Sequence, residues 1–403
     1  MLNKIKEFLK PDKYIYGLFV IYISIMLLVN SIALLNVPNL REVLIVLTKI
    51  IKLCYLGFGI KIIYDIIKNR YITWSMILIP YISFMVMLFS KNRELLLLAF
   101  ILLALRHVDL QKLIKYTLRV VLPMFLIIVI LSLFNIIPNW IYYRGELIRY
   151  SLGFCYPTDA IGYYLLIILM YCYTRREKCT YLELFVLEAF NIFLYASTKG
   201  RLSFLLVTAI LTFMLLYKLL HNIKKLREIF YSKTFQKTIK ILCYSLPIIL
   251  FVFVLVLTFF YGNNNNLAIT LDNLLSGRLR LNNEAFEKYP ITLFGSNIKW
   301  QGWGGYGYTV KEPLETYEYN FVDMSYIRII FDYGIIATAL IIIGYTIELL
   351  QNYNKKDYWS ILVLCFVLIW AFVEPHIVKI STNFLVVLLA PLLEIGRIKI
   401  KKA

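Results

Sequence analysis

Residues 241–261 read ILCYSLPIILFVFVLVLTFFY, a stretch without a single charged side chain. It is the main part of the apolar run 239–261, and a second run of this kind covers residues 14–35. Each run supplies the roughly 20 residues that an α-helix needs to cross the hydrocarbon core of a bilayer. Because the runs are apolar on every face, an amphipathic helix of a soluble protein does not account for them. The sequence therefore predicts membrane-spanning helices.

The composition of the whole chain agrees with this prediction. Of the 403 residues, 61% are hydrophobic and 17% are charged, whereas a soluble domain has roughly 45–50% and 25%. The first run exceeds the roughly 7–15 residues of a signal-peptide core, and no small-x-small cleavage site follows it, so we expect it to be the first spanning helix. The net charge of +19 does not indicate nucleic-acid binding, since the basic residues lie in short segments between apolar runs.

The hydropathy pattern predicts an all-α, polytopic membrane protein with about twelve transmembrane helices. Residues 1–261 are expected to form nine of them, residues 262–322 one long polar loop, and residues 323–403 the last three and a basic tail. The predicted spans are 14–35, 43–60, 72–89, 94–105, 117–137, 159–173, 180–197, 202–219, 240–261, 323–349, 358–373 and 380–396.

The distribution of basic residues predicts the orientation of the chain. With a cytoplasmic N-terminus, 27 of the 43 Lys and Arg residues fall in cytoplasmic segments, counting the inner ends of spans. The opposite side holds 13, five of them in the long loop. Since Lys and Arg are disfavoured in translocated short loops, both termini are expected in the cytoplasm and loop 262–322 outside. The basic inner face also predicts contact with anionic membrane lipids.

Basic residues on the predicted outer side need a separate explanation. Four external segments carry Arg or Lys beside Gly, Ser or Thr. A single arginine at this level can simply extend toward lipid headgroups. Several together indicate a phosphate or pyrophosphate site, because the guanidinium group binds phosphate bidentately and keeps its charge. The residues concerned are Arg149, Lys199, Arg201, Arg278 and Arg280.

The long loop is rich in aromatic residues and glycine, and includes Trp300, Trp303 and Tyr306. An interfacial aromatic belt is one explanation. Stacking against sugar rings is the other, and the glycines would let the loop move over a substrate. Metal chemistry, ATP hydrolysis and serine hydrolysis are not indicated, because the sequence has no Asp-x-Asp pair, no P-loop and no Gly-x-Ser-x-Gly. The six scattered cysteines and three distant histidines predict neither a disulfide framework nor a metal site, and no cofactor is expected.

A set of short motifs, spread over residues 90–345, resembles the Wzy family of polysaccharide polymerases, which is related to the O-antigen ligases. The matching pieces are Arg149-Tyr-Ser-Leu-Gly-Phe with Pro157, Ser197-Thr-Lys-Gly-Arg201, Ser276-Gly-Arg278, Tyr289-Pro-Ile-Thr-Leu-Phe-Gly295, Val322-Asp-Met-Ser-Tyr326 and Asp332-Tyr-Gly334.

The resemblance implies a metal-independent, GT-C-like glycosyltransferase in the bacterial plasma membrane. Such enzymes join oligosaccharide repeat units carried on undecaprenyl pyrophosphate at the outer face, for capsule, exopolysaccharide or O-antigen. The family's pyrophosphate-binding arginines map onto Arg201 and Arg278, and Arg149 is a third candidate. Ligase relatives often have His where this chain has Asp323, which weakens a ligase assignment. Polymerases commonly show Pro-Asn where this chain has Pro157-Thr158-Asp159, so the role of that corner is less certain.

The hypothesis is an inverting glycosyl transfer with Arg201, Arg278 and Asp323 as catalytic residues. The arginines would neutralise the leaving pyrophosphate, and Asp323 would accept the proton of the acceptor hydroxyl. Asp323 could instead be a helix N-cap. The predicted substrate-binding residues are Arg149, Lys199, Arg280, Trp300, Trp303, Tyr306 and Tyr326.

Other polar pairs, Arg328–Asp332, Glu188–Asn191 and Glu374–His376, could be structural or could line a cavity. A structural role is favoured for the first, because residues four apart meet on one helix face. A flippase or other transporter of lipid-linked oligosaccharide is the alternative function, and a ligase differs only in its acceptor. Expected protein partners of a polymerase are a flippase and a chain-length regulator.

Overall fold

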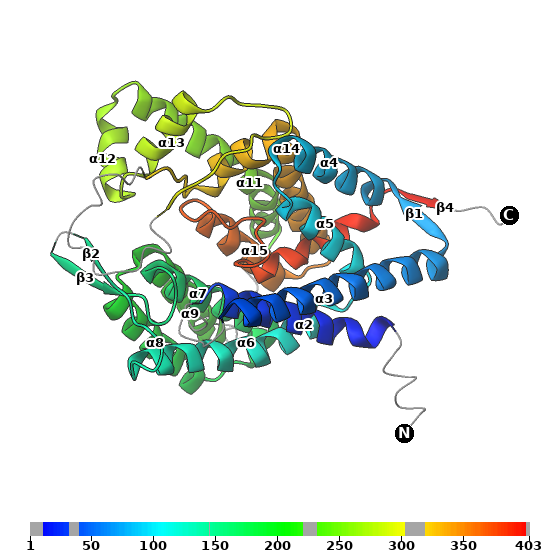
Figure 1. Ribbon diagram of the computed structural model, residues 1–403, viewed down its shortest axis with the longest axis horizontal. Helices are drawn as coiled ribbons and strands as arrows, with labels where there is room; N and C mark the ends of the chain where they lie inside the picture. The colour runs from blue at the N-terminus through cyan, green and yellow to red at the C-terminus, as the bar shows by residue number, and fades with distance from the viewer. Residues whose placement is uncertain (1–10, 32–39, 145, 221–231, 303–318, 400–403) are drawn as a thin grey trace.

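The computed structural model describes residues 11–31, 40–144, 146–220, 232–302 and 319–399, and this part of the chain is mostly helical (Figure 1). The helices of the first half are α2 (Pro11–Val29), α3 (Leu40–Asn69), α4 (Trp74–Ser90), α5 (Glu94–Leu105), α6 (Leu110–Leu133), α7 (Pro157–Arg175), η2 (Arg176–Lys178), α8 (Tyr181–Thr198) and α9 (Arg201–Leu220). Those of the second half are α11 (Lys233–Gly262), α12 (Asn266–Leu274), α13 (Arg278–Lys288), α14 (Ser325–Asn354), α15 (Tyr358–Trp370) and the 3-10 helix η3 (Phe384–Glu394).

Five helices in the described part of the chain are long and apolar enough to cross a membrane, namely α6, α9, α11, α14 and the segment Glu42–Asn69 of α3. Shorter apolar helices, including α5 and α15, accompany them. Helix α5 has 12 residues and coincides with the short fourth span expected from the sequence. The structure thus supports an all-α membrane protein, while the count of twelve spans stays a prediction.

Helix α3 extends well beyond the predicted span 43–60. The prediction ended where Lys61 introduces a charge. In the structure the helix continues to Asn69, and Lys61 pairs with Asp65 one turn further on. Both side chains are almost completely buried. A charged side chain can stay in an apolar environment when a side chain of opposite charge lies four residues later on the same helix face. This explains why the helix is longer than the predicted span.

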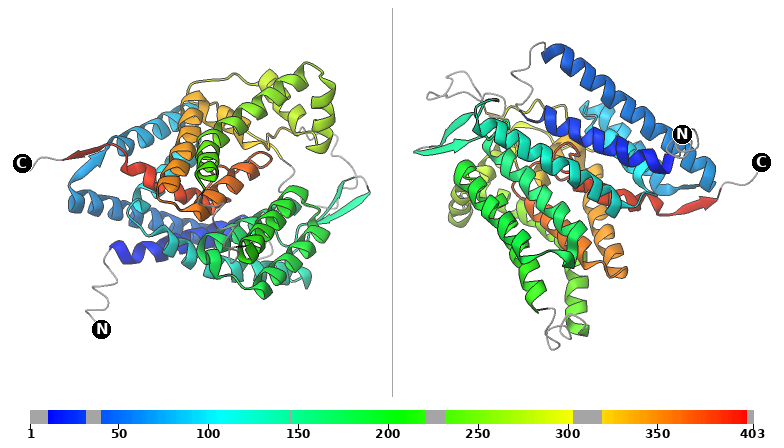
Figure 2. Two further views of the ribbon diagram at one scale, coloured as in Figure 1. Left: turned by 180° about the vertical axis from the view of Figure 1, so that it is seen from behind. Right: turned by 90° about the horizontal axis from the view of Figure 1, so that it is seen from below.

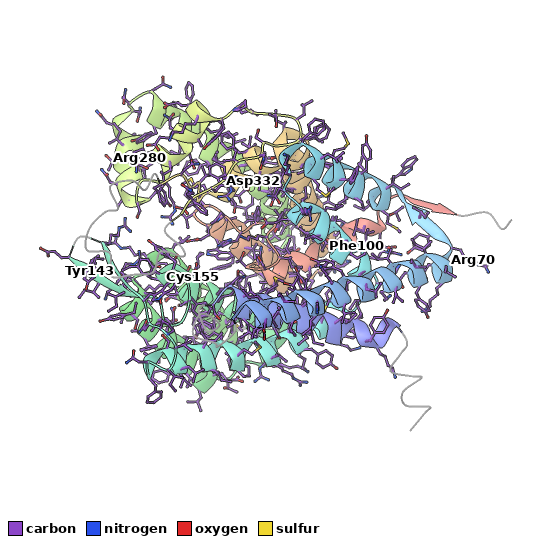
Figure 3. All side chains as sticks on the ribbon, viewed as in Figure 1. Arg70, Phe100, Tyr143, Cys155, Arg280 and Asp332 are labelled. Carbon is purple, nitrogen blue, oxygen red and sulfur yellow. The ribbon has the colours of Figure 1, made fainter. Side chains whose placement is uncertain are left out.

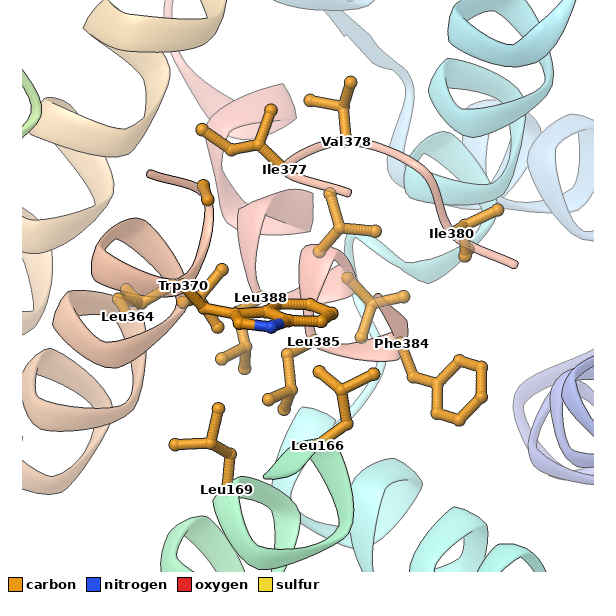
Figure 4. Close-up of a cluster of buried hydrophobic side chains, with 14 of the residues drawn as sticks. Leu166, Leu169, Leu364, Trp370, Ile377, Val378, Ile380, Phe384, Leu385 and Leu388 are labelled. Carbon is orange, nitrogen blue, oxygen red and sulfur yellow. The ribbon is translucent and has the colours of Figure 1, made fainter. Parts of the chain in front are cut away.

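The centre of the fold is α7, most of whose residues are buried. Helices that are apolar on all sides need neighbours on all sides. Figure 4 shows one region of this core, in which Leu166 and Leu169 of α7 face Trp370 at the end of α15 and Leu385 of η3. By contrast, α11 exposes large apolar side chains such as Ile249 and Phe259, as expected of a surface in contact with lipid.

Two pairs of short strands mark opposite ends of the molecule (Figures 1 and 2). Strand β1 (Tyr71–Thr73) pairs with β4 (Arg397–Lys399) at one end, and β2 (Ile141–Arg144) pairs with β3 (Leu147–Tyr150) at the other. Each pair joins segments that the predicted topology places on a single side of the membrane. The ion pair between Arg176 and Asp357, 2.8 Å, likewise joins two segments on one predicted side of the membrane, the side that also carries the β1–β4 pair. Which side is external stays a prediction.

The long segment between α11 and α14 folds back onto α14. Helix α14 is broken at Gly334, whose φ of 80° lies outside the helical region. The backbone of residues 292–296 occupies the break: the amide of Ser296 donates to the carbonyl of Phe331, 2.8 Å, and the amide of Ile335 donates to the carbonyl of Thr292, 3.0 Å. These bonds replace the helical ones that the break removes. Two of the quoted motifs, 289–295 and 332–334, therefore meet here.

Candidate functional site

The first element of the site is the turn between α12 and α13, which positions Arg278. Ser276 and Gly277 have positive φ values of 66° and 82°, and the carboxylate of Asp272 accepts the amide of Leu279, 2.7 Å. This side-chain cap starts α13 at Arg278. The guanidinium group of Arg278 donates to the carbonyls of Val373, 3.0 Å, and Leu275, 3.1 Å, so it is held in one orientation.

Two carboxylates flank the Arg278 guanidinium. Asp323 Oδ2 lies 3.7 Å from Arg278 Nε, and Glu374 Oε1 lies 3.7 Å from Arg278 Nη2. Asp323 is not the N-cap of α14, since that position is Met324. The start of α14 is fixed instead by Ser325, whose amide donates to the carbonyl of Ala371, 3.0 Å, and whose hydroxyl donates to the carbonyl of Glu374.

The electrostatics of this group favour a proton on one of the two carboxylates, Glu374. Burial raises the pKa of Glu374 to about 8, against the opposing effect of Arg278. Burial also raises the pKa of Asp323, again opposed by Arg278 and then by Arg328. Both carboxylates lie beside the same guanidinium group, and one proton on Glu374 relieves the repulsion between them. Burial lowers the pKa of the neighbouring His376 to about 3, so its imidazole is neutral at pH 7.

Three further arginines are electrostatically linked to Arg278 through their shared effect on Arg144. Arg149 of β3 is buried, donates to the carbonyl of Thr198, 2.9 Å, and stacks its guanidinium over the Tyr156 ring at 5.3 Å. This contact ties the β2–β3 hairpin to the α8–α9 turn, which carries Arg201. The pKa of the largely exposed Arg144 is lowered by partial desolvation and then by the charges of Arg149, Arg278 and Arg201. We call these four residues, which are linked by their electrostatic effects on Arg144, the arginine cluster.

The α8–α9 turn itself is tightly packed. Lys199 ends α8 with a φ of 55°, and a Cβ added at Gly200 would lie 2.5 Å from the Ile161 side chain. The short turn of the Ser-Thr-Lys-Gly-Arg motif is thus pressed against α7, and Arg201 follows as the first residue of α9. This packing fixes the backbone position of Arg201.

A cavity of about 280 Å³ is lined by His376, whose Nε2 lies 3.9 Å from Glu374 Oε2. One lining residue is Arg328, whose guanidinium lies against the rings of Trp300, 4.4 Å, and Phe321, 4.6 Å. The Asp332 carboxylate accepts from Arg328 Nε and from Trp300 Nε1, each at 2.7 Å. The rest of the lining comes from the α4–α5 turn and from segments 296–298 and 375–379.

Of the predicted catalytic and binding residues, Arg278 lies beside Asp323, and Arg149, Arg201 and Arg278 all act electrostatically on Arg144. That they form one active site stays a prediction. Trp300 lines the adjoining cavity, and Lys199 lies in the α8–α9 turn. Trp303 and Tyr306 lie outside the described residues.

Two other predicted binding residues are placed apart from these groups. Arg280 pairs with Glu284, 2.6 Å, on the exposed side of α13, and Tyr326 is fully buried with its hydroxyl donating to the Leu368 carbonyl, 2.9 Å. Figure 3 labels Tyr143, on the hairpin, and Arg280 on α13, the two elements that border the arginine cluster.

Sequence reasoning missed Arg144 and Glu374 as members of the site. Arg144 lies in the predicted external loop between spans 117–137 and 159–173, and Glu374 follows a predicted span directly, so each position carried a signal. The Arg328–Asp332 pair, for which a structural role was favoured, forms the wall of the cavity. No group of three or more His, Cys, Asp or Glu side chains that could hold a metal ion occurs among the described residues.

Comparison of the chain with protein-family models, with curated proteins and with solved structures finds no match. Any functional assignment therefore depends on the residues and on their geometry.

Proposed function

We propose that this protein is a membrane glycosyltransferase of the polysaccharide-polymerase type, which joins oligosaccharide repeat units carried on undecaprenyl pyrophosphate. The observation that carries the proposal is Arg278 beside two partly buried carboxylates, with Arg144, Arg149 and Arg201 in its electrostatic neighbourhood. Arg278 belongs to both parts, since it lies 3.7 Å from Asp323 and from Glu374. A pyrophosphate leaving group and a hydroxyl that must lose a proton need these two kinds of group side by side.

The arginine cluster supplies the binding of the pyrophosphate. Guanidinium groups match phosphate oxygens in bidentate geometry and remain charged when partly buried. Arg149 and Arg278 are already oriented by backbone carbonyls, so little side-chain freedom is lost when an anion binds. Mutual repulsion among Arg144, Arg149, Arg201 and Arg278 is relieved by the same anion. Four such charges offer the neutralisation that a divalent ion provides in many soluble transferases.

The chemistry is an inverting displacement. The acceptor hydroxyl oxygen forms a bond to C1 of the donor sugar as the bond from C1 to the pyrophosphate oxygen breaks. The electron pair of that bond leaves with the pyrophosphate, where Arg201 and Arg278 stabilise the developing charge. Asp323 accepts the hydroxyl proton, and its raised pKa makes it a stronger base than an ordinary aspartate.

The membrane setting completes the proposal. The proposed enzyme has twelve spans, a GT-C-like architecture and cytoplasmic termini. Its site lies at the outer face of a bacterial plasma membrane. The contacts that join segments on a single predicted side of the membrane support this topology. A flippase that delivers the lipid-linked repeat and a chain-length regulator are the protein partners that such a reaction needs.

Purified protein in lipid vesicles, supplied with lipid-linked repeat units, tests this function. Extension of the glycan is expected without added metal and in the presence of EDTA. Loss of all extension on chelation would contradict the metal-independent mechanism. Absence of extension under every condition, together with transfer to a different lipid acceptor, would instead identify a ligase.

One observation favours a second candidate, a transporter of lipid-linked oligosaccharide. Helix α14 is broken at Gly334, and broken spanning helices often line transport sites. The same vesicles separate the two candidates. A transporter moves the lipid-linked sugar across the bilayer and leaves its length unchanged, whereas a polymerase lengthens it.

A further inference from the structure

We infer that the cavity around Arg328 and Asp332 is a sugar subsite that holds one residue of the acceptor glycan. This inference rests on the proposed glycosyl transfer and adds the place where the acceptor is bound. The relevant features are the position of the cavity relative to the carboxylates, its preorganised polar groups and its size.

The position of the cavity indicates that it binds the acceptor sugar and not the donor sugar. Asp323 and Glu374 both contact Arg278 on the side of the arginine cluster. On the other side, Glu374 Oε2 lies 3.9 Å from Nε2 of His376, which lines the cavity. Arg328, which lines the cavity, also donates to the carbonyl of Val322 next to Asp323, 3.3 Å. The carboxylates thus lie between arginine cluster and cavity. In an in-line displacement the base acts on the acceptor side of C1, away from the leaving group.

The polar groups of the cavity are held in place before any ligand binds. The Arg328 guanidinium is fixed between two aromatic rings and by Asp332, and Trp300 donates to the other oxygen of the same carboxylate. The side chains of Arg328 and Asp332 are 17% and 11% exposed. A fixed pair of donor and acceptor suits adjacent hydroxyl groups of a sugar ring, because one ring presents both hydrogen-bonding roles at a constant spacing.

The backbone under these side chains is equally rigid. Asp332 comes two residues before the break of α14, which segment 292–296 fills with backbone hydrogen bonds. Apolar surfaces from Phe321, Ile298 and Ile377 complete the lining and offer contacts for the C–H face of a sugar. With about 280 Å³, the cavity is just below the roughly 300–1,000 Å³ of drug-sized ligand sites, which suits a single sugar residue.

The binding test uses the full-length protein in lipid nanodiscs and a soluble probe, the repeat-unit oligosaccharide released by mild acid from the lipid-linked pool of the source cell. Calorimetric titration measures its affinity for the unmodified protein and for Asp332→Asn and Asn297→Trp. Asn297 lines the cavity with an exposed side chain, so its replacement fills the space without disturbing helix packing. Asn273→Trp, on the exposed face of α12, is the matched control.

We expect both cavity variants to bind the probe at least tenfold more weakly and the Asn273→Trp control to bind within twofold of the unmodified protein. Unchanged affinity in both cavity variants would overturn the subsite. Chain extension, measured on the same preparations, separates this inference from the proposed function. Extension with an unchanged KM for the acceptor in both variants rejects the subsite and keeps the transferase. Probe binding that both variants lose, without any extension, keeps the subsite and rejects the polymerase.

Discussion

Gly334 and Gly295 face each other across the break in α14 so closely that neither has room for a side chain. A Cβ on Gly334 would lie 2.4 Å from the backbone nitrogen of Gly295, and a Cβ on Gly295 would lie 2.4 Å from the carbonyl oxygen of Asp332. Both glycines also have positive φ values, of 80° and 85°. This contact attaches the long loop to the helix that carries Arg328 and Asp332, so it determines the shape of the cavity.

The close contact between Gly334 and Gly295 predicts that one added methyl group strongly destabilises the protein. Gly334→Ala should destabilise the protein by more than about 2 kcal/mol, because the new Cβ meets backbone atoms that cannot move independently and the φ is unfavourable. Gly17→Ala is the control, since a Cβ there meets nothing within 4 Å and alanine favours the helical conformation. Thermal unfolding in detergent measures both. Equal melting temperatures for the two variants would show that the contact is not close.

Replacement of Arg278 tests the pyrophosphate clamp. Arg278→Lys should reduce chain extension by at least about tenfold, because an ammonium group cannot bind phosphate bidentately or span two carboxylates. Arg119→Lys, on an exposed face of α6, makes the same substitution away from the site and should retain full activity. An Arg278→Lys variant as active as the unmodified protein would exclude this role for Arg278.

Asp323→Asn should lower the rate of chain extension by roughly 10²–10⁴-fold, the usual contribution of a general base. Asp323→Glu keeps a carboxylate and should restore part of the rate. Initial rates are best compared at saturating substrate, so that binding does not obscure the effect. If the asparagine variant kept its rate, the proton would have to go to another group, of which Glu374 is the nearest candidate by contact with Arg278.

The pKa of Glu374 predicts how stability depends on pH. The folded protein keeps a proton on this carboxyl up to about pH 8, whereas the unfolded chain releases it near 4.5. The contribution of this bound proton to the free energy of unfolding is therefore complete below pH 4.5 and is lost as the pH rises through 8. The slope is at most about 1.4 kcal/mol per pH unit. Glu374→Gln removes the group that titrates, so the melting temperature of this variant should fall less between pH 5 and 8 than that of the unmodified protein.

A matched substitution completes the pH experiment. Glu284→Gln, on the exposed side of α13, removes a carboxylate of the same length away from the buried group. Its pH profile should follow that of the unmodified protein. Identical pH profiles for the unmodified protein and Glu374→Gln would show that the carboxyl at position 374 is ionised in the folded state at pH 7.

Cysteine labelling tests the orientation. Asn273→Cys lies in the segment predicted to be external, and Lys356→Cys lies between α14 and α15 on the predicted cytoplasmic side. A membrane-impermeant maleimide applied to intact cells should label the first variant and leave the second unlabelled until the cells are opened. The opposite pattern would invert the topology, and the proposed site would then face the cytoplasm.

Much of the fold followed from single segments of the sequence. The apolar run 239–261 lies inside α11, and the run 94–105 coincides with α5, because burial in lipid or protein depends on composition along one helix. Helix ends were less accurate where charges pair within a helix, as Lys61 does with Asp65. The twelfth predicted span contains the 3-10 helix η3, with Pro391 inside it, which hydropathy does not distinguish from an α-helix.

The sequence by itself determined which segments are apolar helices, where basic residues accumulate, and that arginines recur in the segments predicted to be external. Only the tertiary structure decided that Arg278 meets Glu374, almost a hundred residues later, and that Arg328 and Asp332 form the wall of a cavity. The physical reason is the range of the two effects. Hydrophobic partition and helix formation depend on neighbours within a few turns, whereas the contacts of polar loops depend on the order in which the helices pack.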